Sequence, residues 1–204
     1  MIADFDGDIS TFLDTKVEGS IPILTTRNLV LFPGVITPIL IGRPASLNLV
    51  KKMQKNPKTT IAVFCQKNPD IEVPRYDDLH STGVYARLIR VMDMPGDRSE
   101  ITVILQALGK CHLESLDGVK PYYKGTTTKI EEVMPDFKSK EFMSLIANLK
   151  STTVEYIKKN DDMPDETQFA LTNINNDVVL ANFVCANMMF SVQEKMDMLE
   201  ENSI

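Results

Sequence analysis

The sequence has few of the side chains from which metal centres and nucleophilic sites are usually built. It contains two histidines, His80 and His112, and three cysteines at positions 65, 111 and 185. These residues do not have the spacing of a known metal site, and an odd number of scattered cysteines indicates free thiols in a reducing compartment. We therefore expect no bound metal, no disulfide framework and a cytoplasmic location.

Sequence motifs for nucleotide binding and for serine catalysis are also missing. Without a G-x-x-x-x-G-K-[ST] stretch there is no loop to cradle nucleotide phosphates, and without G-x-S-x-G or S-x-x-K there is no recognisable serine nucleophile. Cys111 and His112 are adjacent, and adjacent side chains of a strand point to opposite faces, so they do not form a nucleophile–base pair. We expect no catalytic and no cofactor-binding residue in this chain.

Long apolar runs are absent as well. No segment approaches the ~20 residues that a membrane-spanning helix needs, and the acidic N-terminus does not have the form of a secretory signal. Residues 1–19 hold five acidic residues against one lysine, which predicts a flexible acidic leader. We expect no membrane partner.

Charge divides the chain into two parts. Residues 1–128 hold 15 lysines and arginines against 14 aspartates and glutamates, a net charge of +1, whereas residues 129–204 hold 7 against 14, a net charge of −7. The apolar periodicity changes from that of strands to that of helices near Pro135. We therefore predict an α+β protein with a β-rich subdomain at 20–133 and an all-helical subdomain at 134–204.

The β-rich part is predicted from β-branched runs, prolines and turn signals. A helix is expected at 44–55, where Pro44 suits the first turn. Pro95-Gly96 suits a type II turn and predicts a β-hairpin. The predicted strands fall within 20–42, with a turn at Pro33-Gly34, and at 59–66, 84–93, 99–108, 111–116 and 121–133.

Four helices are predicted in the second part. Apolar residues from Phe142 to Ile157 follow helical spacing, and Asp165 is expected to cap a short helix after Pro164. Residues 177–190 are apolar nearly all round, which predicts a central helix. Ser191 and Glu194 form a capping box that starts the last helix.

The first part of the chain also contains several short motifs, which follow one another from residue 27 to residue 110. They are Arg27, Val30, Phe32, Pro33 and Gly34, then Gly42 and Arg43, then Gln66 and Lys67, then Asp78, Leu79, Gly83 and Ala86, and finally Gly109 and Lys110. In order and spacing these motifs resemble the N-terminal family of bacterial ATP-dependent Lon proteases. The resemblance implies a PUA-like β pseudo-barrel followed by a helical bundle that leads toward an ATPase module.

The resemblance also implies a function. Full-length members are homohexameric ATP-dependent serine endopeptidases that degrade misfolded and regulatory proteins, and their ATPase module uses ATP and magnesium. The present region would recognise and hold unfolded or damaged protein substrates and meet other copies of itself in the hexamer. Because the ATPase module and the Ser-Lys protease domain do not occur in these 204 residues, we expect a piece of a longer protein rather than a stand-alone relative.

Two other functions are compatible with a PUA-like fold. One is a stand-alone RNA- or protein-binding module, since residues 19–128 carry a net charge of +5. Their basic residues are not clustered with aromatic residues, so a nucleic-acid partner is not expected. The other is an adaptor in a ligase-type complex, for which the chain has no zinc-binding cysteine pattern.

Candidate substrate-binding residues lie in two places. The predicted hairpin tip carries Met92, Met94 and Arg98, which combine adaptable apolar side chains with charge. Arg43 lies at the start of the helix at 44–55, where the helix dipole disfavours a cation, so its presence indicates another use. We expect these loops to contact substrate, and the apolar residues of the helical part, Met188, Met189, Met196 and Met198 among them, mainly to fill its core.

Overall fold

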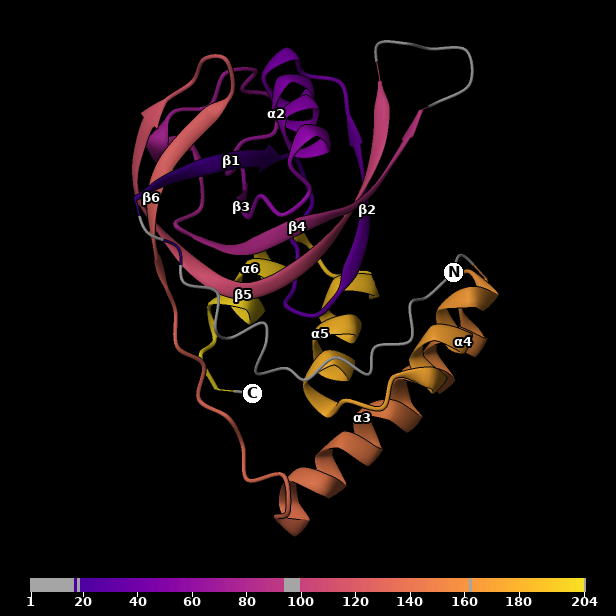
Figure 1. Ribbon diagram of the computed structural model, residues 1–204. Coiled ribbons are helices and arrows are strands. Elements are labelled where there is room, and N and C mark those ends of the chain that lie inside the picture. The colour runs from indigo at the N-terminus through magenta and orange to yellow at the C-terminus, as the bar shows by residue number, and fades with distance from the viewer. Residues whose placement is uncertain (1–16, 18, 94–99, 162, 204) are drawn as a thin grey trace.

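The computed structural model describes residues 17, 19–93, 100–161 and 163–203. The predicted leader at 1–19 therefore lies almost entirely outside the described residues, and so does the predicted turn at 94–97. In the described part, the α+β class is confirmed, with a sheet followed by helices (Figure 1). No helix in that part is both long and apolar enough to span a bilayer.

The described strands form one six-stranded sheet with the order β2-β5-β4-β3-β1-β6. Strands β1 and β3 are parallel, and all other neighbours are antiparallel. Because β6 pairs with β5 as well as with β1, five strands close into a barrel and β2 remains outside it as an edge strand. The bounds are β1 (Ser20–Thr26), β2 (Ile36–Ile41), β3 (Ile61–Cys65), β4 (Thr82–Asp93), β5 (Ile101–Gly118) and β6 (Tyr123–Lys129).

Strand β5 connects most of this sheet. The predicted β-hairpin is confirmed as β4 and β5, but the predicted strands 99–108 and 111–116 are a single strand of 18 residues. It pairs with β2, β4 and β6 in turn. Register shifts in the β4–β5 and β5–β6 pairings mark bulges, and bulges bend a strand. The bends allow one strand to follow the barrel wall.

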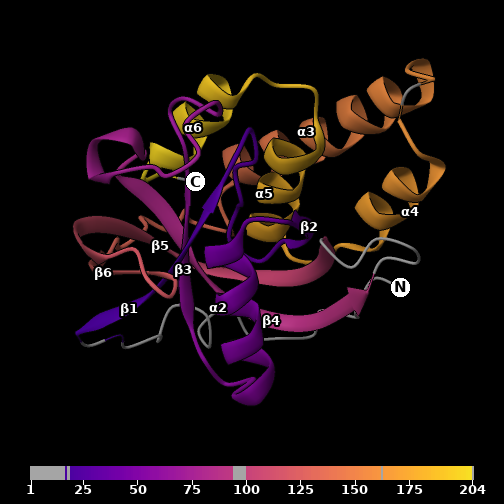
Figure 2. The same ribbon diagram turned by 90° about the horizontal axis from the view of Figure 1, so that it is seen from above.

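Helix α2 (Pro44–Lys55) has the predicted bounds and covers the barrel (Figure 2). Its first residue is a proline, whose missing N–H costs nothing in the first turn. Leu49, Val50 and Met53 are buried against the barrel core, while its lysines face solvent. The start of the helix is thereby held next to the end of β2.

The helical part contains α3 (Lys140–Lys159), α4 (Asp165–Asn173), α5 (Asp177–Asn187) and α6 (Val192–Glu200). The capping box of Ser191 and Glu194 is confirmed at the start of α6. The prediction that Asp165 caps α4 was wrong, because Pro164 takes the N-cap position and the helix begins at Asp165 itself.

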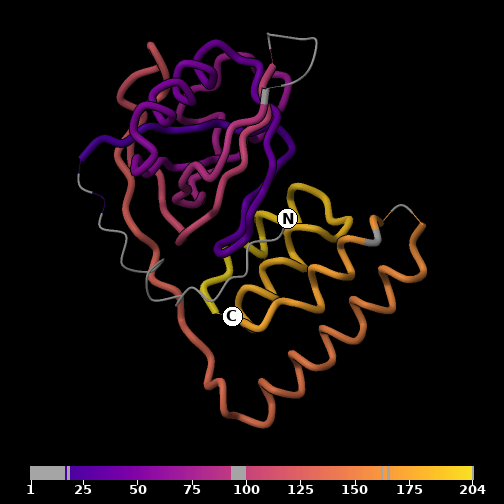
Figure 3. The backbone as a smooth tube through the Cα atoms, turned by 45° about the vertical axis from the view of Figure 1, so that its right-hand side comes forward, coloured from indigo at the N-terminus to yellow at the C-terminus, as the bar shows by residue number. Residues whose placement is uncertain are grey.

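The hydrophobic core of the barrel includes residues of the last helix. Met196 and Leu199 of α6 belong to the main barrel cluster, whereas α3, α4 and α5 share a smaller cluster that contains Ile157, Leu171 and Leu180. Figure 3 shows the last helices, in yellow, beside the barrel and α3, in orange, farther from it. The division into subdomains at 20–133 and 134–204 stays a prediction, since α6 packs with the first of them.

The loop between β1 and β2 is fixed by α5. Asn182 of α5 donates a buried hydrogen bond of 3.0 Å from Nδ2 to the carbonyl of Pro33. The next residue, Gly34, has φ +79° and approaches Val179 so closely that a Cβ would lie 2.8 Å from its Cγ2. Only glycine fits this turn without strain.

A buried lysine also joins the barrel to the C-terminal segment. Lys110 of β5 lies 3.0 Å from Glu132 Oε1, with both side chains almost completely buried. Its Nζ donates a hydrogen bond of 2.7 Å to the carbonyl of Glu201. The carboxylate contact is an ion pair without a directed hydrogen bond, since Glu132 Oε1 accepts none from the described residues.

We predict that Glu132→Gln strongly destabilises the fold. Removing one partner of a buried ion pair leaves a buried charge uncompensated, which costs about 3–5 kcal/mol. The free energy of unfolding is measured by urea titration. Glu131→Gln is the matched control, because the Glu131 side chain is 80% exposed and exposed ion pairs contribute about 0–1 kcal/mol. Equal losses for the two variants would show that the buried pair does not stabilise the fold.

Candidate functional site

The outer face of β2, β5 and β4 presents an exposed apolar row. Leu40 of β2 and Met92 of β4 both pair with Thr102 of β5, and residues in register share one face of a sheet. Leu40 is 56% exposed and Met92 41% exposed. In the parallel row beside it, Ile104 of β5 lies between Pro38 and Arg90. Large apolar side chains thus lie at solvent on β2 and β4, on either side of Thr102 of β5.

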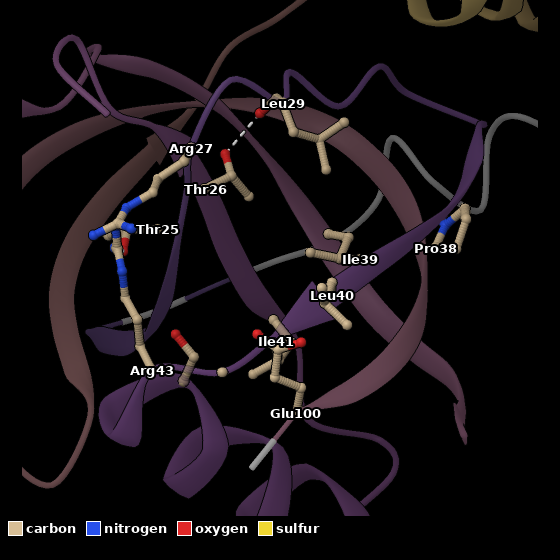
Figure 4. Close-up of a pocket in the computed structure, with 12 residues that line it drawn as sticks. Thr25, Thr26, Arg27, Leu29, Pro38, Ile39, Leu40, Ile41, Arg43 and Glu100 are labelled. Carbon is tan, nitrogen blue, oxygen red and sulfur yellow. Dashed lines mark hydrogen bonds between the residues drawn. The ribbon is translucent and has the colours of Figure 1, made fainter. Parts of the chain in front are cut away.

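A pocket of about 470 Å³ lies beside this row. In the described residues β2 pairs with β5 alone, and the pocket runs along β2 toward the end of β1 (Figure 4). It is lined by Thr25, Thr26, Arg27, Leu29, Pro38, Ile39, Leu40, Ile41, Gly42, Arg43, Ser46 and Glu100. Apolar residues make up one side, and the two arginines lie at one end.

A second pocket of about 920 Å³ adjoins the same arginines. Most of its lining is apolar and comes from the start of α2 and from two loops, with Val73, Val119 and Pro121 as examples. Arg27, Gly42 and Arg43 line both pockets. These three residues therefore form a boundary shared by the two pockets, which we call the arginine ridge.

Arg43 has an unusual environment for a cation. It is the N-cap residue of α2, whose first turn contains no acidic residue, although the positive end of a helix dipole favours anions. Its Nη1 donates a hydrogen bond of 3.2 Å to Thr25 Oγ1, while Nη2 is buried without a hydrogen-bond partner among the described residues. Burial lowers the pKa of Arg43, and the neighbouring charge of Arg27 lowers it further.

The residues predicted from the sequence have different outcomes. Arg43 lines both pockets, and Met92 belongs to the exposed apolar row. Met94 and Arg98 lie outside the described residues, so their role stays a prediction. The sequence does not predict Leu40 as a candidate site residue, because the residues around it give no sign that β2 and β4 pair with the same segment of β5. Arg27 was noted only as part of a motif.

The helical part buries fewer of its apolar residues than expected. Met188 and Met196 are buried as predicted, but Met189 is 59% exposed and Phe169 68% exposed. Met143 and Leu145 also project from α3 into solvent. The helical part therefore also exposes large apolar side chains, and none of them lines either of the two pockets described above.

The described residues form neither a metal site nor a reactive thiol. No group of three or more histidine, cysteine, aspartate or glutamate side chains suited to a metal ion occurs in the described part of the chain. Cys65 and Cys111 are free and buried, and burial raises the pKa of both thiols. Their sulfur atoms are therefore poor nucleophiles.

Comparison with known proteins assigns the chain to a family. Residues 20–204 match the family model of the ATP-dependent protease La (LON) substrate-binding domain. The chain belongs to this family. Because the match covers the whole sheet and all the described helices, the resemblance drawn from the short motifs is confirmed, and the alternative of an RNA-binding module is not favoured.

Individual Lon proteases are similar to the chain over most of its length. The Lon protease of Parabacteroides distasonis is 38% identical over 196 residues, which cover 96% of this chain and 23% of that protein. The Lon protease of Flavobacterium johnsoniae is 37% identical over 185 residues, or 91% of this chain and 22% of that protein. The chain thus spans less than a quarter of the length of these relatives.

Solved structures of the Lon family share the fold. The N-terminal domain of the Mycobacterium avium complex Lon protease superposes with a TM-score of 0.67 at 16% identity, covering 90% of both chains. A Lon N-terminal domain protein from Xanthomonas campestris gives 0.59 at 13% identity, covering 91% of this chain and 92% of that one. The predicted pseudo-barrel followed by helices is therefore confirmed.

We predict that the thiols of this Lon domain react slowly while it is folded. Burial raises the pKa of all three cysteines, which lowers the fraction of each thiol that is deprotonated at pH 8, and only the thiolate reacts. Iodoacetamide should therefore label all three cysteines of the folded chain more slowly than those of the urea-unfolded chain. A cysteine that reacts at equal rates in both states would contradict this environment.

Proposed function

We propose that this chain is the part of an ATP-dependent Lon protease that binds unfolded or damaged polypeptides. The observation that carries the proposal is the exposed apolar row, which lies beside a pocket along the edge strand β2. Unfolded chains expose apolar side chains, and unpartnered apolar surface attracts them. An edge strand also offers backbone groups to an extended peptide.

The surface is suited to many sequences rather than one. Met92 is flexible and polarizable, so it adapts to side chains of different shapes. Leu40 and the pocket walls supply apolar area without a pattern of directed hydrogen bonds. Binding by such contacts is weak and broad, which is what a protease for damaged proteins requires of its first contact with substrate.

The remaining functions belong to the longer protein. We propose that it is a homohexameric serine endopeptidase of the cytoplasm, in which ATP and magnesium act in an ATPase module outside this chain. Six copies of a weak site then act together, since linked sites bind one polypeptide far more tightly than a single site does. The present chain contributes substrate binding, and the chemistry is carried out elsewhere.

We predict that the double variant Leu40→Ser/Met92→Ser weakens binding of an unfolded polypeptide. Each exposed apolar contact contributes on the order of 1 kcal/mol, so losing two should raise Kd about thirtyfold. The ligand is reduced, carbamidomethylated α-lactalbumin carrying a fluorophore, and Kd is measured by fluorescence anisotropy.

Met143→Ser/Leu145→Ser is the matched control, because these side chains of α3 are 53% and 60% exposed and lie away from the sheet. It should leave Kd within about twofold, since its side chains make no contact with the bound chain. Circular dichroism checks that both variants are folded. If the α3 variant loses binding and the sheet variant does not, the substrate surface is the helical one.

A further inference from the structure

The arginine ridge carries positive charge that no ion pair among the described residues neutralises. The ion pairs formed among the described residues use Lys110, Lys129 and Lys159, and neither Arg27 nor Arg43 takes part in one. Arg27 is exposed, and Arg43 is partly buried. Both line the same two pockets.

Three positive groups converge on this ridge. Figure 4 shows the side chains of Arg27, from the end of β1, and Arg43, from the start of α2, extending toward each other beside Thr25. The third group is the positive end of the dipole of α2, a helix of 12 residues. Like charges held together repel. Among the described residues, the hydrogen bond of Arg43 to a threonine hydroxyl and the attraction of Glu72, which forms no ion pair with either arginine, do not fully compensate them. An anion at this point would.

The surroundings restrict which anion fits. Glu100 lines the first pocket and Glu72 the second, and each repels a ligand with many negative charges, such as a nucleic-acid backbone. The first pocket has apolar wall segments such as Leu29 and Leu40 among polar ones. The second pocket is mostly apolar, with Val73 and Val119, and Lys120 adds a positive charge to it. A ligand that combines one negative charge with apolar groups on both sides meets both conditions.

We propose that Arg27 and Arg43 bind a carboxylate of the substrate polypeptide, while apolar side chains next to that carboxylate enter the two pockets. A guanidinium presents its N–H donors in a planar fork that matches the two oxygens of a carboxylate. The carboxylate comes from the C-terminus of the chain or from an aspartate or glutamate side chain. This inference rests on the proposed function, since its ligand is the same unfolded polypeptide, and it adds a chemical preference to it.

Three fluorescent ten-residue peptides of leucine, valine and serine test the preference. The first has an amidated C-terminus and no charge, the second has a free C-terminal carboxylate, and the third is amidated with one central glutamate between leucines. Kd is measured by fluorescence anisotropy at constant ionic strength. At least one carboxylate peptide should bind about tenfold more tightly than the neutral peptide, as hydrogen bonds to charged groups are among the stronger ones.

The variants Arg27→Gln and Arg43→Gln should each abolish that tenfold gain. Arg27 is exposed and its loss leaves the core untouched, so this variant tests the site even if Arg43→Gln unfolds. Lys51→Gln is the control, because it removes one positive charge from the exposed side of the same helix and lines neither pocket. It should keep the gain.

Each outcome decides the proposal. A gain for the free C-terminus identifies the chain end as the ligand, and a gain for the central glutamate identifies a side chain. Equal binding of all three peptides, a gain that survives Arg27→Gln, or a gain that Lys51→Gln also removes would overturn the carboxylate site. If the neutral peptide binds, the proposed function stands even when the carboxylate site is overturned. If no peptide binds, both the proposed function and the carboxylate site fail.

Discussion

Strand β6 closes the barrel by pairing with two strands at once, and the arrangement of the candidate site is built on this closure. Its residues pair with β1 on one side and with the far end of β5 on the other. Gly125 of β6 allows the close approach, because a Cβ there would lie 2.1 Å from the carbonyl oxygen of Ser115 in β5. With β1 and β5 fixed in this way, the end of β1 lies beside the start of α2, and Arg27 meets Arg43.

Closure also explains why the proposed substrate-binding surface lies on β2. Each strand of the barrel pairs with at least two neighbours, whereas a strand outside the ring keeps one edge free along its length. Strand β2 pairs with β5 alone among the described strands, and it carries Leu40 in register with Met92. A rigid closed barrel thus presents one adaptable edge, and weak contacts at that edge are compatible with many different substrate chains.

The parts of the fold that could be predicted from the sequence are those with local signals. Pro44 and the apolar spacing defined α2, and Ser191 with Glu194 defined the start of α6. Closure by β6 and the packing of α6 on the barrel depend on contacts between residues far apart in the chain, for which a single sequence has no signal. Arg43 could be predicted as a site residue because a cation at a helix start is unfavourable by itself. Its neighbour Arg27 could not be predicted as a candidate site residue, because only the closed barrel brings it next to Arg43.

The substrate-binding surface is tested most directly by hydrogen–deuterium exchange of the chain with and without an unfolded polypeptide. Peptides that cover residues 25–29, 36–43, 87–92 and 101–104 should exchange more slowly in the presence of the ligand, because their backbone amides lie at the edge strand, the exposed row and the arginine ridge. The helices α3 and α4 should exchange at unchanged rates. Slower exchange confined to α3, α4 and α5, with no change in the sheet, would contradict the central claim.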